Sequence, residues 1–181
     1  MKKGFTLIEL LVVVSIIGIL ATVLVVNLSS SQVKARNARI QNDVEQLSSA
    51  SEIILLGSAT FAGNSAGLKT NDVDLPIKAG ASVAGTSVGI DSFREEGSSV
   101  NLVANAPSNP SSSSTTDKYY YYYMKTNPAG TSYVIYSMAA DTFKGTGTPT
   151  LVAGDKFYYC KTGKSCSIKI LTSTDVATPT Y

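Results

Sequence analysis

One long apolar run near the N-terminus constrains this chain more than any other feature. From Phe5 to Leu28 there are 24 residues, and Glu9 is the single charged residue among them. A helix of that length rises about 36 Å, which is enough to cross a bilayer with some tilt. The sequence therefore predicts a membrane-spanning helix.

Glu9 is the unusual residue of this run. A carboxylate at the centre of a membrane helix costs about 2.5–3.5 kcal/mol on insertion scales, so a carboxylate here needs a partner. The nearest candidate is the amine that a cut after Gly4 would create on Phe5. We expect Glu9 to neutralise this amine, either on its own chain or on a neighbouring copy.

The residues around this position form a dense motif. The stretch Lys3–Glu9 (Lys-Gly-Phe-Thr-Leu-Ile-Glu) resembles the class III leader of type IV pilins and pseudopilins. The resemblance implies that prepilin peptidase cuts between Gly4 and Phe5 and that Phe5 is then N-methylated. The alternative is a signal anchor or a secretory signal peptide with a chance Glu. Against the latter, a signal peptide has an apolar region of roughly 7–15 residues, which is shorter than this one.

Two further positions are compared with the same family. Gly18 matches a glycine that the family often places in the membrane, and it is expected to be a site of local helix flexibility because Gly weakens a helix by about 1 kcal/mol relative to Ala. Val26 stands where many members have a kinking Pro. Because Val keeps its N–H, we expect a straighter helix here.

Charge and composition limit the classes of function. The formal charge is +2 at pH 7, and the chain contains no His. Loss of Lys2 and Lys3 with the leader would bring the charge to about 0, which argues against a nucleic-acid partner and suits closely packed subunits. Without His, imidazole catalysis and His-based metal sites are excluded.

The orientation in the membrane follows from the flanking charges. Lys2 and Lys3 precede the apolar run, which favours a cytoplasmic N-terminus. Lys34, Arg36 and Arg39 follow the run and oppose this assignment. The leader motif decides the question, and we expect most of the chain to lie outside the cytoplasm.

Residues 29–56 are predicted to continue the helix in amphipathic form. No Pro or Gly interrupts the chain from Thr22 to Leu56, and Gly57 is a stop signal. The apolar residues recur at helical spacing and predict packing on a sheet rather than a coiled coil. They are Val33, Ile40, Val44, Leu47 and Ile54.

Residues 57–117 are rich in Gly, Ser, Ala and Asn and predict a variable connecting region with one or two short strands. Its apolar islands are Val73–Ile77, Val83–Ile90 and Val100–Val103. The low-complexity stretch 105–116 is either a patch for O-linked glycan or a flexible loop, and the loop is favoured.

The last third of the chain predicts two antiparallel hairpins. The run Tyr119–Met124, a turn at Asn127–Gly130 and the segment Tyr133–Tyr136 form the first. Lys156–Cys160 and Ser167–Leu171 form the second. Strand alternation places Tyr120 and Tyr122 on the face opposite to Tyr119, Tyr121 and Tyr123. We expect the tyrosines to pack the sheet rather than to form a ligand platform or an electron path.

Cys160 and Cys166 are the two cysteines of the chain. A close pair in an extracytoplasmic domain predicts a disulfide, which would stabilise the fold by about 2 kcal/mol. The pair resembles the C-terminal disulfide loop of many pilins, although this loop is much shorter.

Catalytic and metal-binding patterns were not found in the sequence. The carboxylates are scattered without the spacing of an acid–base pair, and the twelve-residue calcium-loop pattern is missing around Asn71, Asp72 and Asp74. We predict no catalytic residue, no metal and no cofactor, and hence a protein that is not an enzyme.

These observations predict an α+β fold in which one long N-terminal helix, apolar and then amphipathic, packs on a C-terminal antiparallel β-sheet, as in pilins. The predicted parts are a leader (1–4), a transmembrane or filament-core helix (5–28), an amphipathic helix (29–56), a connecting region (57–117) and a sheet (118–181).

The predicted function is that of a structural subunit. The preferred prediction is a major pilin of a type IV pilus serving adhesion or motility. The alternatives are a pseudopilin of a type II secretion-like apparatus and a minor pilin acting as a tip adhesin or DNA-binding module. The resemblance implies a helical homo-oligomer, prepilin peptidase and methyltransferase, and an inner-membrane assembly platform as partners. It places the precursor in the cytoplasmic membrane and the filament on the cell surface.

Overall fold

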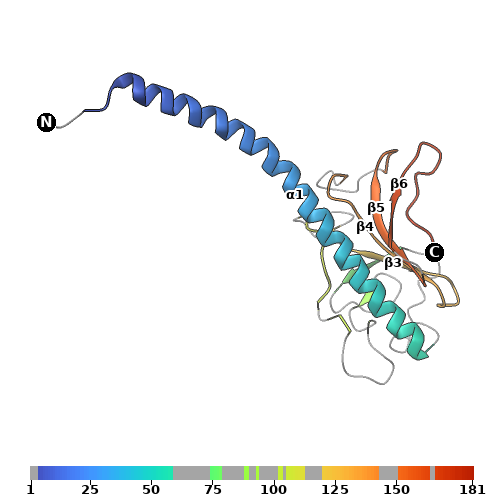
Figure 1. The fold of residues 1–181 in the computed structure, drawn as a ribbon. Coiled ribbons are helices and arrows are strands. Elements are labelled where there is room, and N and C mark those ends of the chain that lie inside the picture. Colours follow the sequence, from blue (N-terminus) through green and yellow to red (C-terminus); the bar gives the residue numbers. More distant parts are fainter. Residues whose placement is uncertain are drawn as a thin grey trace. The chain divides into compact units, whose positions relative to one another are not determined.

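A computed structural model describes residues 4–58, 74–78, 88–89, 93, 102–103, 105–112, 120–142, 151–163 and 166–181. The chain divides into two compact units, Met1–Ala35 and Arg36–Tyr181. One helix, α1 (Leu7–Ser58), supplies most of the first unit and begins the second (Figure 1).

The first unit is an apolar helix whose large apolar side chains are exposed. From Leu7 to Val23 the large apolar side chains are 48–80% exposed, around the whole circumference of α1. A helix that is apolar on all sides is stable when lipid or protein surrounds it. By length and composition α1 is able to cross a bilayer, and none of its most apolar 18-residue stretch is buried. The predicted apolar helix is thus confirmed, and it runs without a break through position 26.

The second unit places the amphipathic part of α1 on a sheet (Figure 1). Ile40, Val44, Leu47 and Ile54 are each at most 1% exposed and form one core cluster with side chains from the strands. Four of the five residues of the predicted apolar stripe therefore meet the sheet, whereas Val33 is half-buried, belongs to the first unit and is outside this core. Burial of each such side chain contributes roughly 1.5–3 kcal/mol.

The sheet has six strands, in the order β2-β1-β3-β4-β5-β6. Neighbours from β1 to β6 are antiparallel, which confirms the predicted α+β class, but β2 runs parallel to β1. The strands are β1 (Leu75–Lys78), β2 (Val88–Gly89), β3 (Tyr123–Thr126), β4 (Tyr133–Met138), β5 (Lys156–Lys161) and β6 (Ser167–Ile170). The strands β1 and β2 lie within the region predicted as a connection.

Both predicted hairpins are present, but the first begins later than expected. The Asn127 side-chain oxygen accepts hydrogen bonds from the N–H groups of Thr131 and Ser132, and Gly130 has a φ of 72°, which only Gly adopts without strain. Strand β3 begins at Tyr123, and not near Tyr119, because the preceding tyrosines pair with a different segment. Ser108 forms a β-bridge with Tyr121, and the Asn109 N–H donates to the Tyr120 carbonyl.

The same contacts correct the expectation of a flexible loop for residues 105–112. Asn109 is fully buried, and its side-chain amide donates to the Ser137 hydroxyl (3.1 Å) and to the Met138 carbonyl (2.7 Å). This part of the low-complexity stretch is therefore anchored to β4. Residues 113–116 lie outside the described residues.

Two tyrosines hydrogen-bond the sheet to carboxylates of α1. The Tyr122 hydroxyl donates to Asp43 at 2.6 Å, and the Tyr133 hydroxyl donates to Glu52 at 2.8 Å. Burial is the largest cause that raises the pKa of Tyr122 well above its usual value, and the hydrogen bond to Asp43 is the second largest. Both phenols therefore act as donors that hold α1 in register with the strands.

We expect the full chain to lose stability above about pH 10, the ordinary pKa of tyrosine. A group whose pKa is raised by folding stabilises the fold fully below its unfolded pKa, and this contribution is lost as the pH rises toward the folded pKa. Tyr122→Phe should lower the free energy of unfolding by about 1.5–3 kcal/mol at neutral pH and flatten its alkaline decline. Urea unfolding at about pH 8 and about pH 11 measures both. Tyr120→Phe, which leaves both helix contacts in place, is the control, and equal alkaline slopes for wild type and Tyr122→Phe would contradict the assignment.

Candidate functional site

The predicted cleavage site lies in extended, exposed chain just before α1. Gly4, Phe5 and Thr6 belong to no helix or strand, and Phe5 is 83% exposed. A Cβ placed on Gly4 would meet nothing within 4 Å. A peptidase needs backbone outside a helix, so the Gly4–Phe5 bond is accessible to one in this conformation.

Thr6 and Glu9 form a capping box at the start of α1. The Glu9 Oε2 atom accepts hydrogen bonds from the Thr6 N–H (2.8 Å) and from the Thr6 hydroxyl (2.7 Å). In return the Glu9 N–H donates to the Thr6 hydroxyl oxygen at 3.4 Å. This reciprocal pattern satisfies donors that a helix N-terminus leaves unpaired. It also fixes the position of the carboxylate one residue away from Phe5.

The second oxygen of Glu9 remains available. Among the described residues, Oε1 of Glu9 accepts no hydrogen bond. An ionised carboxylate has several acceptor sites, and the capping box occupies those on Oε2. The arrangement therefore leaves an oriented anion beside the predicted new amine.

Two other polar residues of the apolar segment, Ser15 and Thr22, are hydrogen-bonded within the helix. The Ser15 hydroxyl donates to the Leu11 carbonyl and the Thr22 hydroxyl to the Ile19 carbonyl, both at 2.7 Å. Polar groups in hydrocarbon must be paired internally, and these two meet that requirement. Gly18 lies between them in regular helix, and an added Cβ would meet nothing within 4 Å. Its predicted role in flexibility stays a prediction.

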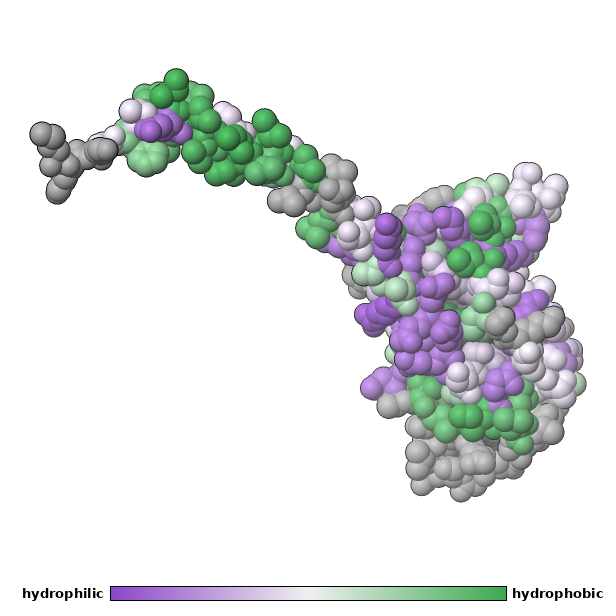
Figure 2. Space-filling view, viewed as in Figure 1, coloured by the Kyte–Doolittle hydropathy of each residue, from purple (hydrophilic) through white to green (hydrophobic). Residues whose placement is uncertain are grey.

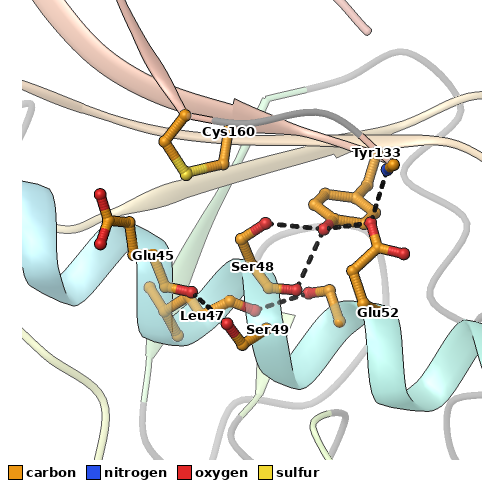
Figure 3. The surroundings of a disulfide bond; sticks show 10 residues. Glu45, Leu47, Ser48, Ser49, Glu52, Tyr133 and Cys160 are labelled. Carbon is orange, nitrogen blue, oxygen red and sulfur yellow. Dashed lines mark hydrogen bonds between the residues drawn. A yellow bond between two sulfur atoms is a disulfide. The ribbon is translucent and has the colours of Figure 1, made fainter.

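In the second unit, Cys160 and Cys166 are joined by a disulfide across the β5–β6 turn. Cys160 is fully buried against the helix-side core, and Cys166 packs at the edge of that core. Figure 3 shows the disulfide above α1, with Glu45, Ser48 and Glu52 on the facing helix. The predicted pairing is thus present, within a structural core rather than at a free surface.

Glu52 connects three elements beside this disulfide (Figure 3). Its Oε1 atom accepts hydrogen bonds from the Tyr133 hydroxyl of β4 and from the Gly163 N–H of the β5–β6 turn, each at 2.8 Å. Ser48 adds a hydroxyl contact to the same Tyr133 hydroxyl at 2.7 Å. Burial is the main cause that raises the pKa of Tyr133; the hydrogen bond with Ser48 opposes this effect, and the hydrogen bond to Glu52 adds to it. One carboxylate therefore ties the helix to a strand and to the disulfide-closed turn.

The structure brings some predicted residues together and leaves others apart. Thr6 and Glu9 contact each other, and a Thr-x-x-Glu spacing before an apolar run is a signal by which their pairing could have been predicted. Glu52 and Gly163 are separated by 111 residues, and no sequence pattern indicated their contact. Within the described residues, no cluster of three His, Cys, Asp or Glu side chains is placed to hold a metal. Asn71 and Asp72 lie outside those residues.

Comparison with known proteins agrees with the N-terminal motif. Residues 1–25 match the family described as the prokaryotic N-terminal methylation motif. The chain is 35% identical over 68 residues to type II secretion system core protein G of Pectobacterium carotovorum subsp. carotovorum, and 33% identical over 69 residues to the protein of that name from Escherichia coli K12. Each match covers 38% of this chain, and 44% and 48% of the two relatives.

The chain thus matches less than half the length of these curated relatives. No solved structure matches the chain. The fold and the N-terminal site together define a pilin-like protein: a long helix, apolar and then amphipathic, followed by an antiparallel sheet. Residues 1–25 carry the class III prepilin leader, so the predicted resemblance to the type IV pilin and pseudopilin family is confirmed.

We expect Glu52→Ala to destabilise the second unit by about 1–3 kcal/mol, because it leaves the Gly163 N–H without its acceptor and leaves the Tyr133 hydroxyl to donate to the Ser48 carbonyl at 3.0 Å instead. Chemical denaturation of the full chain in detergent, with the disulfide intact, measures the effect. Glu45→Ala is the matched control, since this exposed helix glutamate makes no ion pair with the described residues. Equal stability of the two variants would show that the Glu52 contacts contribute nothing.

Proposed function

We propose that this chain is a structural subunit of a pseudopilus, the short filament of a type II secretion-like apparatus. One observation carries the proposal: a class III leader directly precedes a capped, fully exposed apolar helix. The relatives named core protein G of the type II secretion system support this assignment over the first prediction, a major pilin. The earlier alternative is therefore the better supported one.

Processing is the first proposed step. Prepilin peptidase cuts the exposed Gly4–Phe5 bond and removes residues 1–4, and the new Phe5 amine is N-methylated. Before the cut, α1 anchors the precursor in the cytoplasmic membrane. The sheet-bearing unit then lies on the outer side of that membrane.

Glu9 acts in the second step, when the subunit joins the filament. A positive Phe5 amine and a negative Glu9 are each costly in an apolar medium, and a buried charge that loses its partner destabilises by about 3–5 kcal/mol. Thr6 holds one oxygen of Glu9 and leaves the other for an amine. The amine of a neighbouring copy is the proposed ligand, because Glu9 is then neutralised only in the assembled filament.

Helix packing supplies the remaining stabilisation of the filament. The apolar side chains from Leu7 to Val23 are exposed in the single chain and exchange lipid contacts for contacts with neighbouring helices. Dispersion and close packing, rather than the hydrophobic effect, drive association between helices that leave lipid. The proposed partners are copies of this chain, prepilin peptidase and an inner-membrane assembly platform.

Two measurements on cells that express the chain with its own secretion genes test the proposal. Mass spectrometry of the purified protein should give a mature N-terminus at N-methylated Phe5, and electron microscopy should find it in short filaments. An intact Met1 terminus would overturn the assignment to processed subunits. Abundant long surface fibres built from this chain would restore the major pilin prediction.

We expect Glu9→Ala to be cleaved normally but not to assemble, because the Phe5 amine then lacks a counter-charge. Peptidase processing is read by mass spectrometry and assembly by the amount of protein in sheared filaments. Thr6→Ser keeps the hydroxyl of the capping box and serves as the conservative control, which should assemble. Normal filaments from Glu9→Ala would disprove the proposed neutralisation.

A further inference from the structure

The strand β6 forms one edge of the sheet and presents apolar side chains to solvent. Ile168 and Ile170 are 46% and 56% exposed. They pair with Tyr158 and Lys156 of β5, so they lie on the face of the sheet that bears α1. Figure 2 shows an apolar patch at this position, separate from a second patch over the last turns of α1.

This edge lacks the usual protection against self-association. Natural sheets place charges on edge strands to prevent pairing with other chains. The one charge of β6, Lys169, points to the opposite face and pairs with Asp175 at 3.0 Å. The exposed isoleucines are therefore left without a neighbouring charge on their own strand.

An open groove of about 640 Å³ lies beside α1. Ala50 and Ile53 of α1 and Leu102 and Val103 form its apolar floor, and Ile53 is 47% exposed. The cavity adjoining this groove is lined by Asp43, the residue that binds Tyr122 beside β3. At the β6 side, Gln41, Val44 and Glu45 border Cys166 and Ser167. The groove and the β6-side cavity thus lie on different faces of α1, and these faces meet at Glu45.

Charges near the two surfaces are complementary. Glu45 lines the rim of the groove, is exposed, and makes no ion pair with the described residues. Lys156 lies directly opposite Ile170 in the strand register and is 41% exposed. Its ammonium group has three donors, so it can keep Asp141 at 2.7 Å and bind a second carboxylate.

We propose that β6 of one copy inserts Ile168 and Ile170 into the groove between α1 and residues 102–103 of a second copy. The inference rests on the proposed function, because it requires ordered self-association. A contact between two different surfaces of identical chains repeats without closing and generates a helical filament. The contact is small. It forms because the packed helices of the proposed filament hold the sheet-bearing units of neighbouring copies at a high effective concentration.

Site-specific photo-crosslinking in the full chain tests this interface. p-Benzoyl-phenylalanine is introduced at Ile170, the cells are irradiated, and cross-linked peptides from filaments are mapped by mass spectrometry. We expect links from position 170 to Ile53, Leu102 or Val103 of another copy. The same probe at Val176, which is 42% exposed but outside the patch, is the control and should not reach the groove.

Other outcomes overturn the inference in distinguishable ways. Links between positions 168–170 of two copies would indicate symmetric edge pairing and exclude the proposed contact. Links to another protein would exclude it as well. So would intact filaments in which no cross-link forms. In these cases the filament itself, and hence the proposed function, would stand. If the unmodified chain formed no filament, the proposed function would fail together with the inference. Ile170→Lys should lower filament yield about tenfold or more, while Val176→Lys should not.

Discussion

The large apolar side chains in the first half of α1 are exposed within the described part of the chain, and this exposure is the main constraint on the molecule. A fully exposed apolar helix is stable in lipid or among other helices, but not in water. The segment therefore needs internally satisfied polar groups, and Ser15 and Thr22 donate to helix carbonyls. Glu9 is the exception, since its charge cannot be hidden by an internal hydrogen bond.

The same helix continues without a break into the second unit, where it packs on the sheet. Beyond Arg36, the buried apolar residues of α1 share one face and meet the sheet, while Ile53 and Leu56 stay exposed. Two tyrosine hydroxyls donate to carboxylates on α1. Glu52 follows Asp43 by nine positions, about 2.5 helical turns, so the two contacts together resist both sliding and rotation of the helix. The disulfide-closed turn adds a third element through Gly163 and Glu52.

Strong local patterns predicted much of this fold. The apolar run, the stripe from Ile40 to Ile54 and both hairpins followed from periodicity and turn residues, and each is present. The short cysteine spacing likewise predicted the disulfide. Such features depend on residues that are near one another in the chain, where physical rules are direct.

Contacts between distant residues were not predictable in the same way. The five consecutive tyrosines all favour a strand, yet Ser108 pairs with Tyr121 and Asn109 with Tyr120, and β3 begins only at Tyr123. The acceptor for Tyr133 could have been any helix carboxylate, and only the packing selected Glu52. The parallel pairing of β2 with β1 had no local signal, because short strands leave few residues to set register.

The two units place different demands on the proposed assembly. Packing between the apolar helices of neighbouring copies buries a large area but has little directionality. It can therefore hold many copies together without fixing the rotation of each subunit about the filament axis. The proposed head contact of a few side chains is weak alone, but it would discriminate between rotations of the subunit, because Ile168 and Ile170 would enter one particular groove. In the proposed filament the helix would thus supply most of the affinity and the sheet edge most of the geometry. In this proposal the exposed edge strand is tolerable before assembly, because edge contacts of a few side chains are too small to drive aggregation by themselves.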